Sequence, residues 1–269
     1  MRRREPEIFR PPRNEVARLG REFLLVCRSV GRAGLLLWDA IVSMRHVLSA
    51  RARREVVTQM MVYGIRSLGV ITIVAVFIGM ILALQTGIEL RKFNQEVYIG
   101  TAVMATMLRE MGPFMTGLIL AACVASAIAA HLGTMVVSEE IDALEVMSID
   151  PVRFLVMPRI VAMAVMTPLL SFYTCVMGVI GGGVVGMTQL GVSWDTYIEY
   201  ATRYAELRDL YVGMLKAFVF GIMLTTIACH EGLSTSQGAV GVGLATRKTV
   251  IECFLLILVV GYFITRLFY

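Results

Sequence analysis

Three charged residues stand out because they lie inside long apolar stretches. Arg109 and Glu110 interrupt the run from about 97 to 137, and Lys216 lies early in the run from about 211 to 229. A charge at the centre of a bilayer costs at least ~2.5–3.5 kcal/mol on insertion scales, so such groups usually face a cavity or one another. We therefore predict that Glu110 pairs with Lys216, in a position to meet a lipid headgroup or a partner subunit. Arg109, which points about 100° away from Glu110 on a helix, could face a phosphate.

The same three charges allow two other interpretations. In the first, the helices end nearer the outer surface, and the charged side chains extend to water. In the second, the charges line the polar path of a channel or of an ion-coupled secondary transporter.

Covalent catalysis is disfavoured, because Ser126 and His131 would lie about 140° apart on one helix and would not meet. His230-Glu231 also does not continue into an H-E-x-x-H metal pattern.

A short acidic segment, Glu139–Pro151, separates two apolar stretches and contains five acids and no base. On a helix, Ile141, Leu144 and Met147 fall on one side and most of the acids on the other. Proline cannot continue the helical hydrogen bonds, so we expect a helix at 139–150 that Pro151 stops. Such a helix could dock onto a soluble motor, whereas an acidic solvated loop fits the charge equally well. The candidate contact residues are Glu139, Glu140, Ile141, Asp142, Leu144, Glu145, Met147, Asp150 and Pro151.

Composition identifies the class of protein to which these segments belong. Hydrophobic residues make up 57% of the chain, against roughly 45–50% in soluble domains. Several uncharged runs exceed the ~18 residues that mark a membrane span. The cysteines lie singly in apolar segments without a C-x-x-C pair, which is typical of small buried side chains and not of a metal or disulfide framework. We predict an all-α, polytopic membrane protein.

The apolar runs predict five spans. They are expected at about 67–90, 97–137, 160–187, 211–229 and 250–268. The second run is roughly twice the length that one span needs, so we expect a broken or tilted element at 109–113, where the sequence reads R-E-M-G-P. Residues 194–210 predict an amphipathic helix at the membrane interface, with tyrosines on one side and Ser193 as its N-cap.

The residues before the first span divide into two parts. Residues 1–13, which are rich in arginine and proline, predict a disordered basic arm, and 14–66 predict an elbow region with a helix in the headgroup plane. Residues 67–269 would then form the transmembrane domain. The arginines of the elbow helix would face anionic lipid. They recur at helical spacing and are Arg18, Arg21, Arg28 and Arg32.

The distribution of lysine and arginine predicts the orientation. Of the 25 such residues, 14 lie before Ser67. Loops with more lysine and arginine usually stay in the cytoplasm, so we expect a cytoplasmic N-terminus and, with five spans, a C-terminus outside. The acidic helix at 139–150 would then be cytoplasmic, and the helix at 194–210 would lie on the outer side.

Several motifs together resemble the MlaE-type permeases of ABC lipid transporters that work with MCE proteins. The motifs are Gly31-Arg32-Ala33-Gly34, Leu108–Pro113, Glu139–Pro151 with Pro158-Arg159, and Gly238–Gly243 with Ala245-Thr246. The resemblance covers nearly the whole chain and implies a homodimeric permease of a bacterial inner membrane. It also implies a separate ATPase, which would hold ATP and Mg, and a periplasmic or membrane-anchored MCE protein. The implied cargo is phospholipid, moved between the inner and outer membranes to maintain outer-membrane lipid asymmetry, with no nucleic-acid partner.

The residues themselves also indicate that any ATP-driven motor lies on a separate chain. The chain contains no G-x-x-x-x-G-K-[ST] phosphate loop, and the glycine cluster at 238–243 lacks the Lys-Ser/Thr pair. That cluster is typical of a tight loop that enters the last helix. We therefore expect a permease without enzymatic activity or a cofactor of its own, with any nucleotide site on a partner chain.

Overall fold

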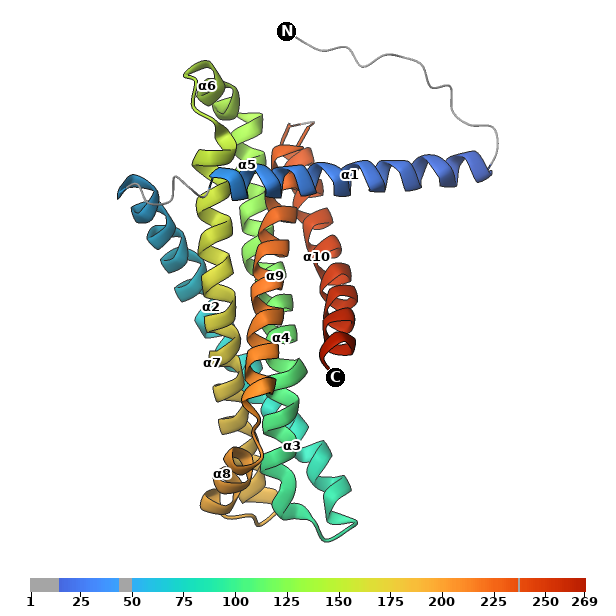
Figure 1. Cartoon of the computed structure of the whole chain (residues 1–269), viewed down its shortest axis with the longest axis vertical. Helices are drawn as coiled ribbons and strands as arrows, with labels where there is room; N and C mark the ends of the chain where they lie inside the picture. The colour runs from blue at the N-terminus through green and yellow to red at the C-terminus, as the bar shows by residue number, and fades with distance from the viewer. Residues whose placement is uncertain (1–14, 44–49, 237) are drawn as a thin grey trace.

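The computed structural model describes residues 15–43, 50–236 and 238–269 and is helical almost throughout these ranges. The basic arm expected at residues 1–13 lies outside the described residues. The α-helices are α1 (Glu15–Ser43), α2 (Ala50–Arg91), α3 (Ile99–Thr106), α4 (Gly112–Leu120), α5 (Ser126–Val137), α6 (Glu140–Val146), α7 (Met157–Gln189), α8 (Trp194–Arg203), α9 (Leu207–Leu233) and α10 (Gly238–Phe268). Figure 1 shows the long helices running side by side, with α1 lying across one end of the bundle.

Five helical stretches in the described ranges are long and apolar enough to cross a membrane. They are Ala52–Arg91, Glu96–Val137, Val152–Gln189, Leu207–Leu233 and Gly238–Phe268. The prediction of an all-helical chain with five candidate spans is therefore confirmed. Each stretch is longer than the apolar run that predicted it, because backbone hydrogen bonding continues through the charged residues that end a hydropathy run.

The second of these stretches does not break at 109–113, where the sequence predicted a break. Instead, a π-helical turn at Met107–Met111 joins α3 to α4, and another at Ala121–Ala125 joins α4 to α5. Pro113 lies in the first turn of α4. A proline ring clashes with the carbonyl four residues earlier in a regular helix, and a wider π turn relieves this clash while the chain stays helical.

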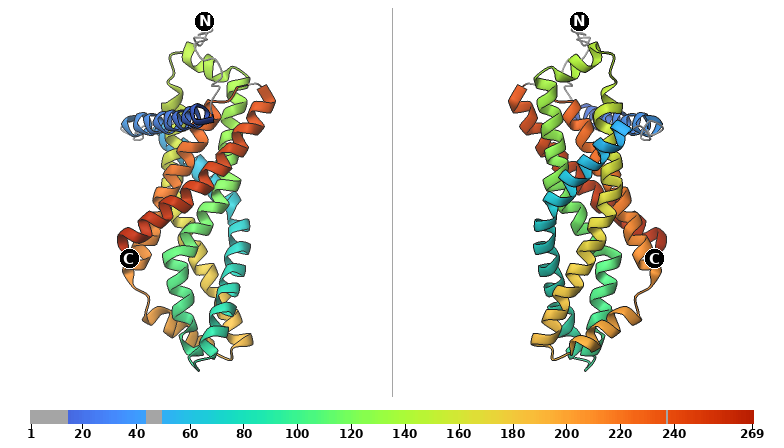
Figure 2. Two further views of the ribbon diagram at one scale, coloured as in Figure 1. Left: turned by 90° about the vertical axis from the view of Figure 1, so that its right-hand side faces the viewer. Right: turned by 90° about the vertical axis from the view of Figure 1, so that its left-hand side faces the viewer.

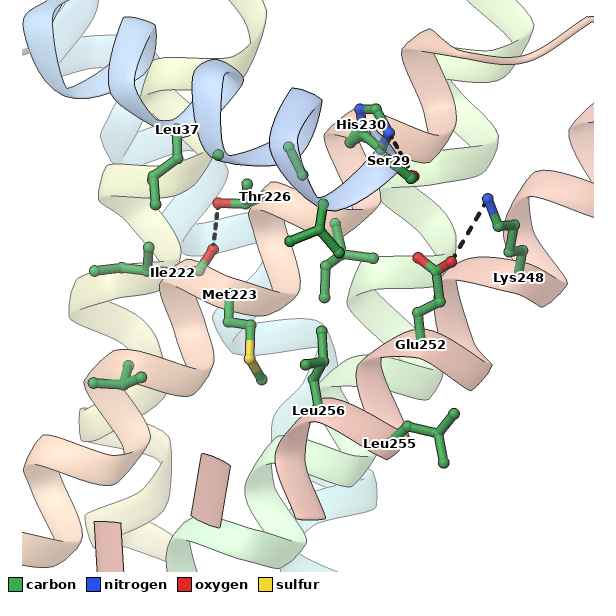
Figure 3. A pocket seen from close by; sticks show the side chains of 15 residues that line it. Ser29, Leu37, Ile222, Met223, Thr226, His230, Lys248, Glu252, Leu255 and Leu256 are labelled. Carbon is green, nitrogen blue, oxygen red and sulfur yellow. Dashed lines mark hydrogen bonds and ion pairs between the residues drawn. The ribbon is translucent and has the colours of Figure 1, made fainter. Parts of the chain in front are cut away.

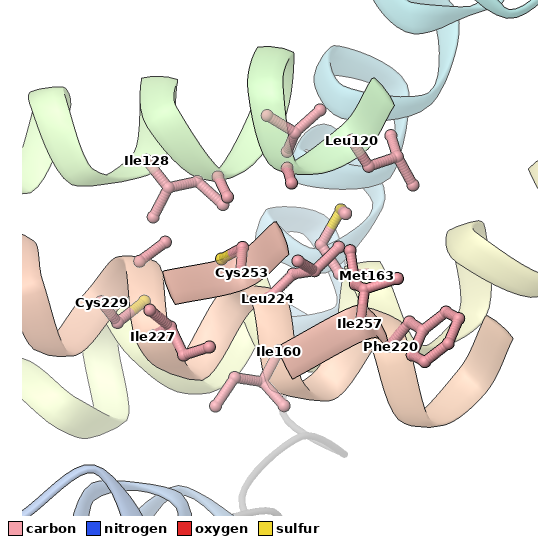
Figure 4. Close-up of a cluster of buried hydrophobic side chains, with 14 of the residues drawn as sticks. Leu120, Ile128, Ile160, Met163, Phe220, Leu224, Ile227, Cys229, Cys253 and Ile257 are labelled. Atoms are coloured by element: carbon pink, nitrogen blue, oxygen red, sulfur yellow. The ribbon is translucent and has the colours of Figure 1, made fainter. Parts of the chain in front are cut away.

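Close helix contacts fix the arrangement of the bundle. Helix α2 packs along α7, and a Cβ atom on Gly79 would lie only 1.8 Å from the carbonyl oxygen of Gly178. Such contacts matter because lipid tails are as apolar as the helices, which leaves van der Waals packing as a main source of association. Figure 4 shows the larger apolar cluster, where Leu120, Met163 and Leu224 meet from three different helices.

The acidic helix α6 is shorter than predicted. It ends at Val146, well before Pro151, and Ser148 takes a left-handed conformation with φ of 61°. The Asp150 carboxylate accepts a hydrogen bond of 2.9 Å from the backbone N–H of Val152. Pro151 adopts helical angles and leads into a π-helical turn at Val152–Val156, so it begins the next helical segment instead of ending α6.

The helix predicted at 194–210 is also shorter. Helix α8 ends at Arg203, and α9 begins at Leu207. The Ser193 hydroxyl accepts a hydrogen bond from the backbone N–H of Thr196, which caps the first turn. The buried Tyr197 donates its hydroxyl to the carbonyl of Val179 on α7 at 3.0 Å, so α8 is fastened to the end of the bundle away from α6 (Figures 1 and 2).

Candidate functional site

Lys216 on α9 is the centre of a polar cluster inside the bundle. Its side chain is 1% exposed. The ammonium group donates hydrogen bonds to the Glu110 carboxylate at 2.7 Å, to the Thr265 hydroxyl at 2.8 Å and to the Arg109 backbone carbonyl at 2.8 Å. These three acceptors match the three donors of an ammonium group. The cluster therefore joins α9 to the π-helical turn that carries Glu110 and to the end of α10.

The Arg109 carbonyl lacks the backbone donor that a regular α-helix would supply. In a regular helix this carbonyl would accept a hydrogen bond from the residue four positions later, which here is Pro113. Proline has no N–H group, so the carbonyl needs another donor. Lys216 supplies it. The π-helical turn and the buried lysine are thus two parts of one arrangement.

Gly213 brings α9 close enough for this contact. A Cβ atom at Gly213 would lie 2.3 Å from the carbonyl oxygen of Leu108, so any larger residue would push the two backbones apart. Lys216 follows Gly213 by three residues and therefore lies on nearly the same side of α9. The small Gly213 allows a short separation between the two helices, and at this separation Lys216 reaches the Arg109 carbonyl.

Arg109 faces a different partner. Its Nε donates to a carboxylate oxygen of Asp209 at 2.8 Å, and Asp209 is 1% exposed whereas Arg109 is 41% exposed. The Tyr269 hydroxyl donates to the other Asp209 oxygen, and the tyrosine ring lies 5.0 Å from the guanidinium carbon. Burial and the bond to Asp209 raise the pKa of Tyr269 to about 12, so the phenol remains a neutral donor at neutral pH.

Two ion pairs therefore lie next to each other, Lys216 with Glu110 and Arg109 with Asp209. In each pair one member is buried and the other is about 40% exposed. The buried Lys216 orients Glu110, and the buried Asp209 orients Arg109. The site can present one cation and one anion to a ligand while its inner groups stay paired.

Sequence reasoning did not find Asp209, Thr265 or Tyr269. Asp209 carried a usable signal, because it precedes Lys216 by seven residues and so shares its side of a helix. Thr265 and Tyr269 carried none, since nothing local relates the end of the chain to residues near position 110. Thr265 also donates to Glu110 at 2.7 Å, so the end of α10 belongs to the site.

The predicted contact segment around α6 is exposed, but not as one apolar face. Ile141 and Leu144 are half-buried, whereas Val146 is 86% exposed and Met147 is 61% exposed. Met147 lies beyond the end of the helix, so helical spacing does not place it with Leu144. The remaining predicted residues, Glu139, Glu140, Asp142, Glu145, Asp150 and Pro151, are exposed except for the half-buried Pro151.

Helix α1 carries the predicted lipid-facing arginines. Arg28 and Arg32 are exposed, whereas the side chains of Arg18 and Arg21 lie outside the described residues. The helix packs on α7, on α9 and on the π-helical turn at Val152–Val156. It also exposes large apolar side chains such as Leu24 and Trp38, which is the composition of a helix at a membrane surface.

Apart from the Lys216 cluster, a groove that the sequence did not predict lies between α1, α9 and α10. Figure 3 shows this groove, which has a volume of about 970 Å³. Apolar side chains such as Leu37, Met223 and Leu256 form its walls, and Lys248 and Glu252 lie at one end. It shares no lining residue with the Lys216 cluster.

Comparison with known proteins identifies the family. The family model described as Permease MlaE matches residues 56–267. The chain belongs to the MlaE permease family. The resemblance seen in the sequence motifs is thereby confirmed, and this MlaE family member is a multi-pass membrane protein of the ABC permease type.

Named relatives cover most of this MlaE family chain. A probable ABC transporter permease protein of Rickettsia bellii is 35% identical over 251 residues, 93% of this chain and 96% of that protein. The intermembrane phospholipid transport system permease protein MlaE of Haemophilus influenzae is 31% identical over 257 residues, 95% of this chain and 98% of that protein. The chloroplastic protein TRIGALACTOSYLDIACYLGLYCEROL 1 of Arabidopsis thaliana is 30% identical over 216 residues, 80% of this chain and 62% of that protein.

Proposed function

We propose that this MlaE family permease is the membrane subunit of an ABC transporter that moves phospholipid between the inner and outer membranes of a bacterium. The observation that carries the proposal is the pair of half-exposed charges, Arg109 and Glu110, held by the buried Asp209 and Lys216. The name of the Haemophilus relative, an intermembrane phospholipid transport permease, supports the choice of cargo.

The two exposed charges suit a lipid headgroup. Arg109 bonds Asp209 through Nε, which leaves guanidinium N–H groups for a phosphate, the kind of anion that arginine binds in a forked geometry. Glu110 would accept from a headgroup amine or hydroxyl. The half-buried Met104 and Met111, which lie on the same helical stretch as Arg109 and Glu110, supply an adaptable surface for acyl chains.

The energy source lies on another chain in this proposal. A separate ATPase would bind ATP and Mg, and the segment Glu139–Pro151 would contact it through Val146, Met147 and the surrounding acids. The exposure of that segment supports a contact role. A second permease copy, related by two-fold symmetry, and an MCE protein would complete the transporter.

The same proposal assigns the membrane orientation. The protein would lie in the bacterial inner membrane with its N-terminus in the cytoplasm and its C-terminus toward the periplasm, because 14 of the 25 lysine and arginine residues lie before Ser67. Helix α1 would then lie along the cytoplasmic leaflet with Arg28 and Arg32 near anionic headgroups.

Reconstitution tests the proposal. The permease is placed in vesicles with its ATPase and MCE partner, and transfer of a fluorescent phospholipid to acceptor vesicles is measured with ATP and with a non-hydrolysable analogue. We expect transfer that requires hydrolysis and that falls when Arg109→Ala replaces the wild type. Ion flux without lipid transfer would instead identify a channel or an ion-coupled transporter. ATP-driven transfer by this chain alone would contradict the assignment of the motor to a partner.

A further inference from the structure

The groove between α1, α9 and α10 has the size and form of a ligand site. Its volume of about 970 Å³ is near the upper end of the range of about 300–1,000 Å³ for small-molecule pockets. Helix α1 contributes Val30 and Leu37, α9 contributes Met223, and α10 contributes Leu255 and Leu256. Figure 3 shows Met223 and Leu256 within this apolar space.

The groove opens sideways toward the surface that faces lipid. Val30 is 65% exposed and Leu255 is 59% exposed, although both line the groove. Both lie on candidate membrane or membrane-surface helices, so a bilayer lipid could enter without crossing a polar barrier. A water-soluble ligand would meet mainly apolar walls.

The polar end of the groove carries charges of both signs. The Lys248 ammonium donates to the buried carboxylate of Glu231 at 2.9 Å and lies 3.6 Å from the Glu252 carboxylate. Lys248 is 52% exposed and Glu252 is 35% exposed, whereas Glu231 is 7% exposed. The His230 ring bonds the Ser29 hydroxyl at 3.1 Å and closes this end against α1.

We propose that this groove binds one zwitterionic phospholipid with an amine in its headgroup. The acyl chains would lie along Met223 and Leu256, the phosphate next to Lys248, and the amine next to Glu252. Lys248 and Glu252 line the groove with opposite charges, which match the two charges of a zwitterionic headgroup. The site is separate from the Lys216 cluster, and the inference does not depend on transport.

Photolabelling tests the site. The full chain is reconstituted in vesicles of phosphatidylethanolamine and phosphatidylglycerol that contain a trace of phosphatidylethanolamine with a diazirine in one acyl chain. Labelled peptides are then mapped by mass spectrometry. We expect labelling concentrated on the segments around Leu37, Met223 and Leu256. Enriching the vesicles in unlabelled phosphatidylethanolamine should reduce this labelling, and enriching them in phosphatidylglycerol should not.

Two variants and a control make the test specific. Met223→Trp fills the groove and should cause loss of labelling at Leu37 and Leu256, whereas Met61→Trp, at a residue of α2 that is 59% exposed, should leave it at the wild-type level. Glu252→Lys turns the local net charge positive and should make phosphatidylglycerol the better competitor.

Three results would overturn the inference. Labelling spread evenly over all exposed helix faces would mean that the groove holds only bulk bilayer lipid. Unchanged competition in Glu252→Lys would remove the role of the charged end. A groove that is shielded from the probe and cross-links to a second copy of the chain would show that a partner subunit fills it.

Discussion

At the residue scale, Lys216 shows how a charge can be kept inside a membrane protein. Desolvating an ammonium group costs several kcal/mol, and the cost is offset only when the geometry is good and the remaining protons are bonded. Glu110, Thr265 and the Arg109 carbonyl meet that condition within 2.8 Å. Because Glu110 is 40% exposed, the pair still has one side available for a ligand.

The first prediction concerns this pair. Glu110→Ala and Lys216→Ala should each impair lipid transfer, and the double variant should be no worse than either single variant, because both remove the same interaction. Transfer is measured in the reconstituted system, with outer-membrane resistance to detergent as the cellular counterpart. Additive defects would mean that the two residues act separately, and normal transfer in both single variants would mean that the pair takes no part in transfer.

The second prediction concerns Pro113. Alanine at this position adds an N–H group that can bond the Arg109 carbonyl and compete with Lys216 for it. A net hydrogen bond of this kind contributes roughly 0.5–1.5 kcal/mol. We expect Pro113→Ala to reduce transfer while the protein stays folded, and Pro158→Ala, a proline in the first turn of α7, to serve as the control. Wild-type transfer in Pro113→Ala would show that the lysine does not need this carbonyl.

At the element scale, α6 and α1 each leave most of their described side chains exposed. Helix α6 has seven residues, too few to be stable alone in water, so its form depends on its packing against α5. Ile141 and Leu144 are half-buried and make that packing. The outward positions, Val146 and Met147, are therefore the better probes of an external partner.

The third prediction follows for the ATPase contact. Val146→Asp should reduce co-purification of the ATPase without loss of membrane insertion, because Val146 is 86% exposed and packs little within the chain. Leu144→Asp should have a similar effect but should also loosen α6. Val240→Asp, at an exposed valine in the first turn of α10, is the matched control, because α10 starts at the same end of the bundle as α6 (Figure 2). Normal ATPase binding by the Val146 variant would show that the contact lies elsewhere.

The fourth prediction concerns α1. Replacing its four arginines with glutamine should weaken its hold on anionic lipid by about 1 kcal/mol per charge. A cysteine at Leu24, in a Cys27→Ser and Cys123→Ser background that removes the exposed native thiols, would then react faster with a water-soluble reagent. An unchanged rate would place α1 against protein and not against lipid. Vesicles without anionic lipid serve as the control, since there the arginines should make no difference.

At the scale of the whole molecule, α10 is held to the bundle by two polar attachments and by a row of buried residues that runs along one side of the helix. Near its start, Lys248 bonds Glu231 of α9 at 2.9 Å. Near its end, Thr265 and Tyr269 bond the polar cluster. Between them, Thr249, Cys253 and Ile257 are buried. A helix held in this way can shift as a unit when either polar attachment opens.

The fifth prediction tests that arrangement. Lys248→Ala and Thr265→Val should each increase hydrogen exchange across α10, and their effects should add in the double variant. The two positions are 17 residues apart, about 25 Å along a helix, which is beyond the range at which substitutions usually couple. Effects larger than the sum would mean that the two ends open together, and no effect of either variant would mean that apolar packing alone holds α10.

The sequence by itself determined the helical class, the five spans, the family and the charges that need partners. These features are local, because hydropathy, helical periodicity and the cost of a buried charge can be read along the chain. Only the tertiary structure decided that the chain before Pro113 forms a π-helical turn and does not break, and that α6 ends before Pro151. It also decided that Asp209, Thr265 and Tyr269 complete the polar cluster. It also revealed the groove, whose walls come from helices about 200 residues apart in the chain. These features depend on how closely helices approach, as at Gly213 against Leu108, and that distance is set by packing between residues that no local pattern relates.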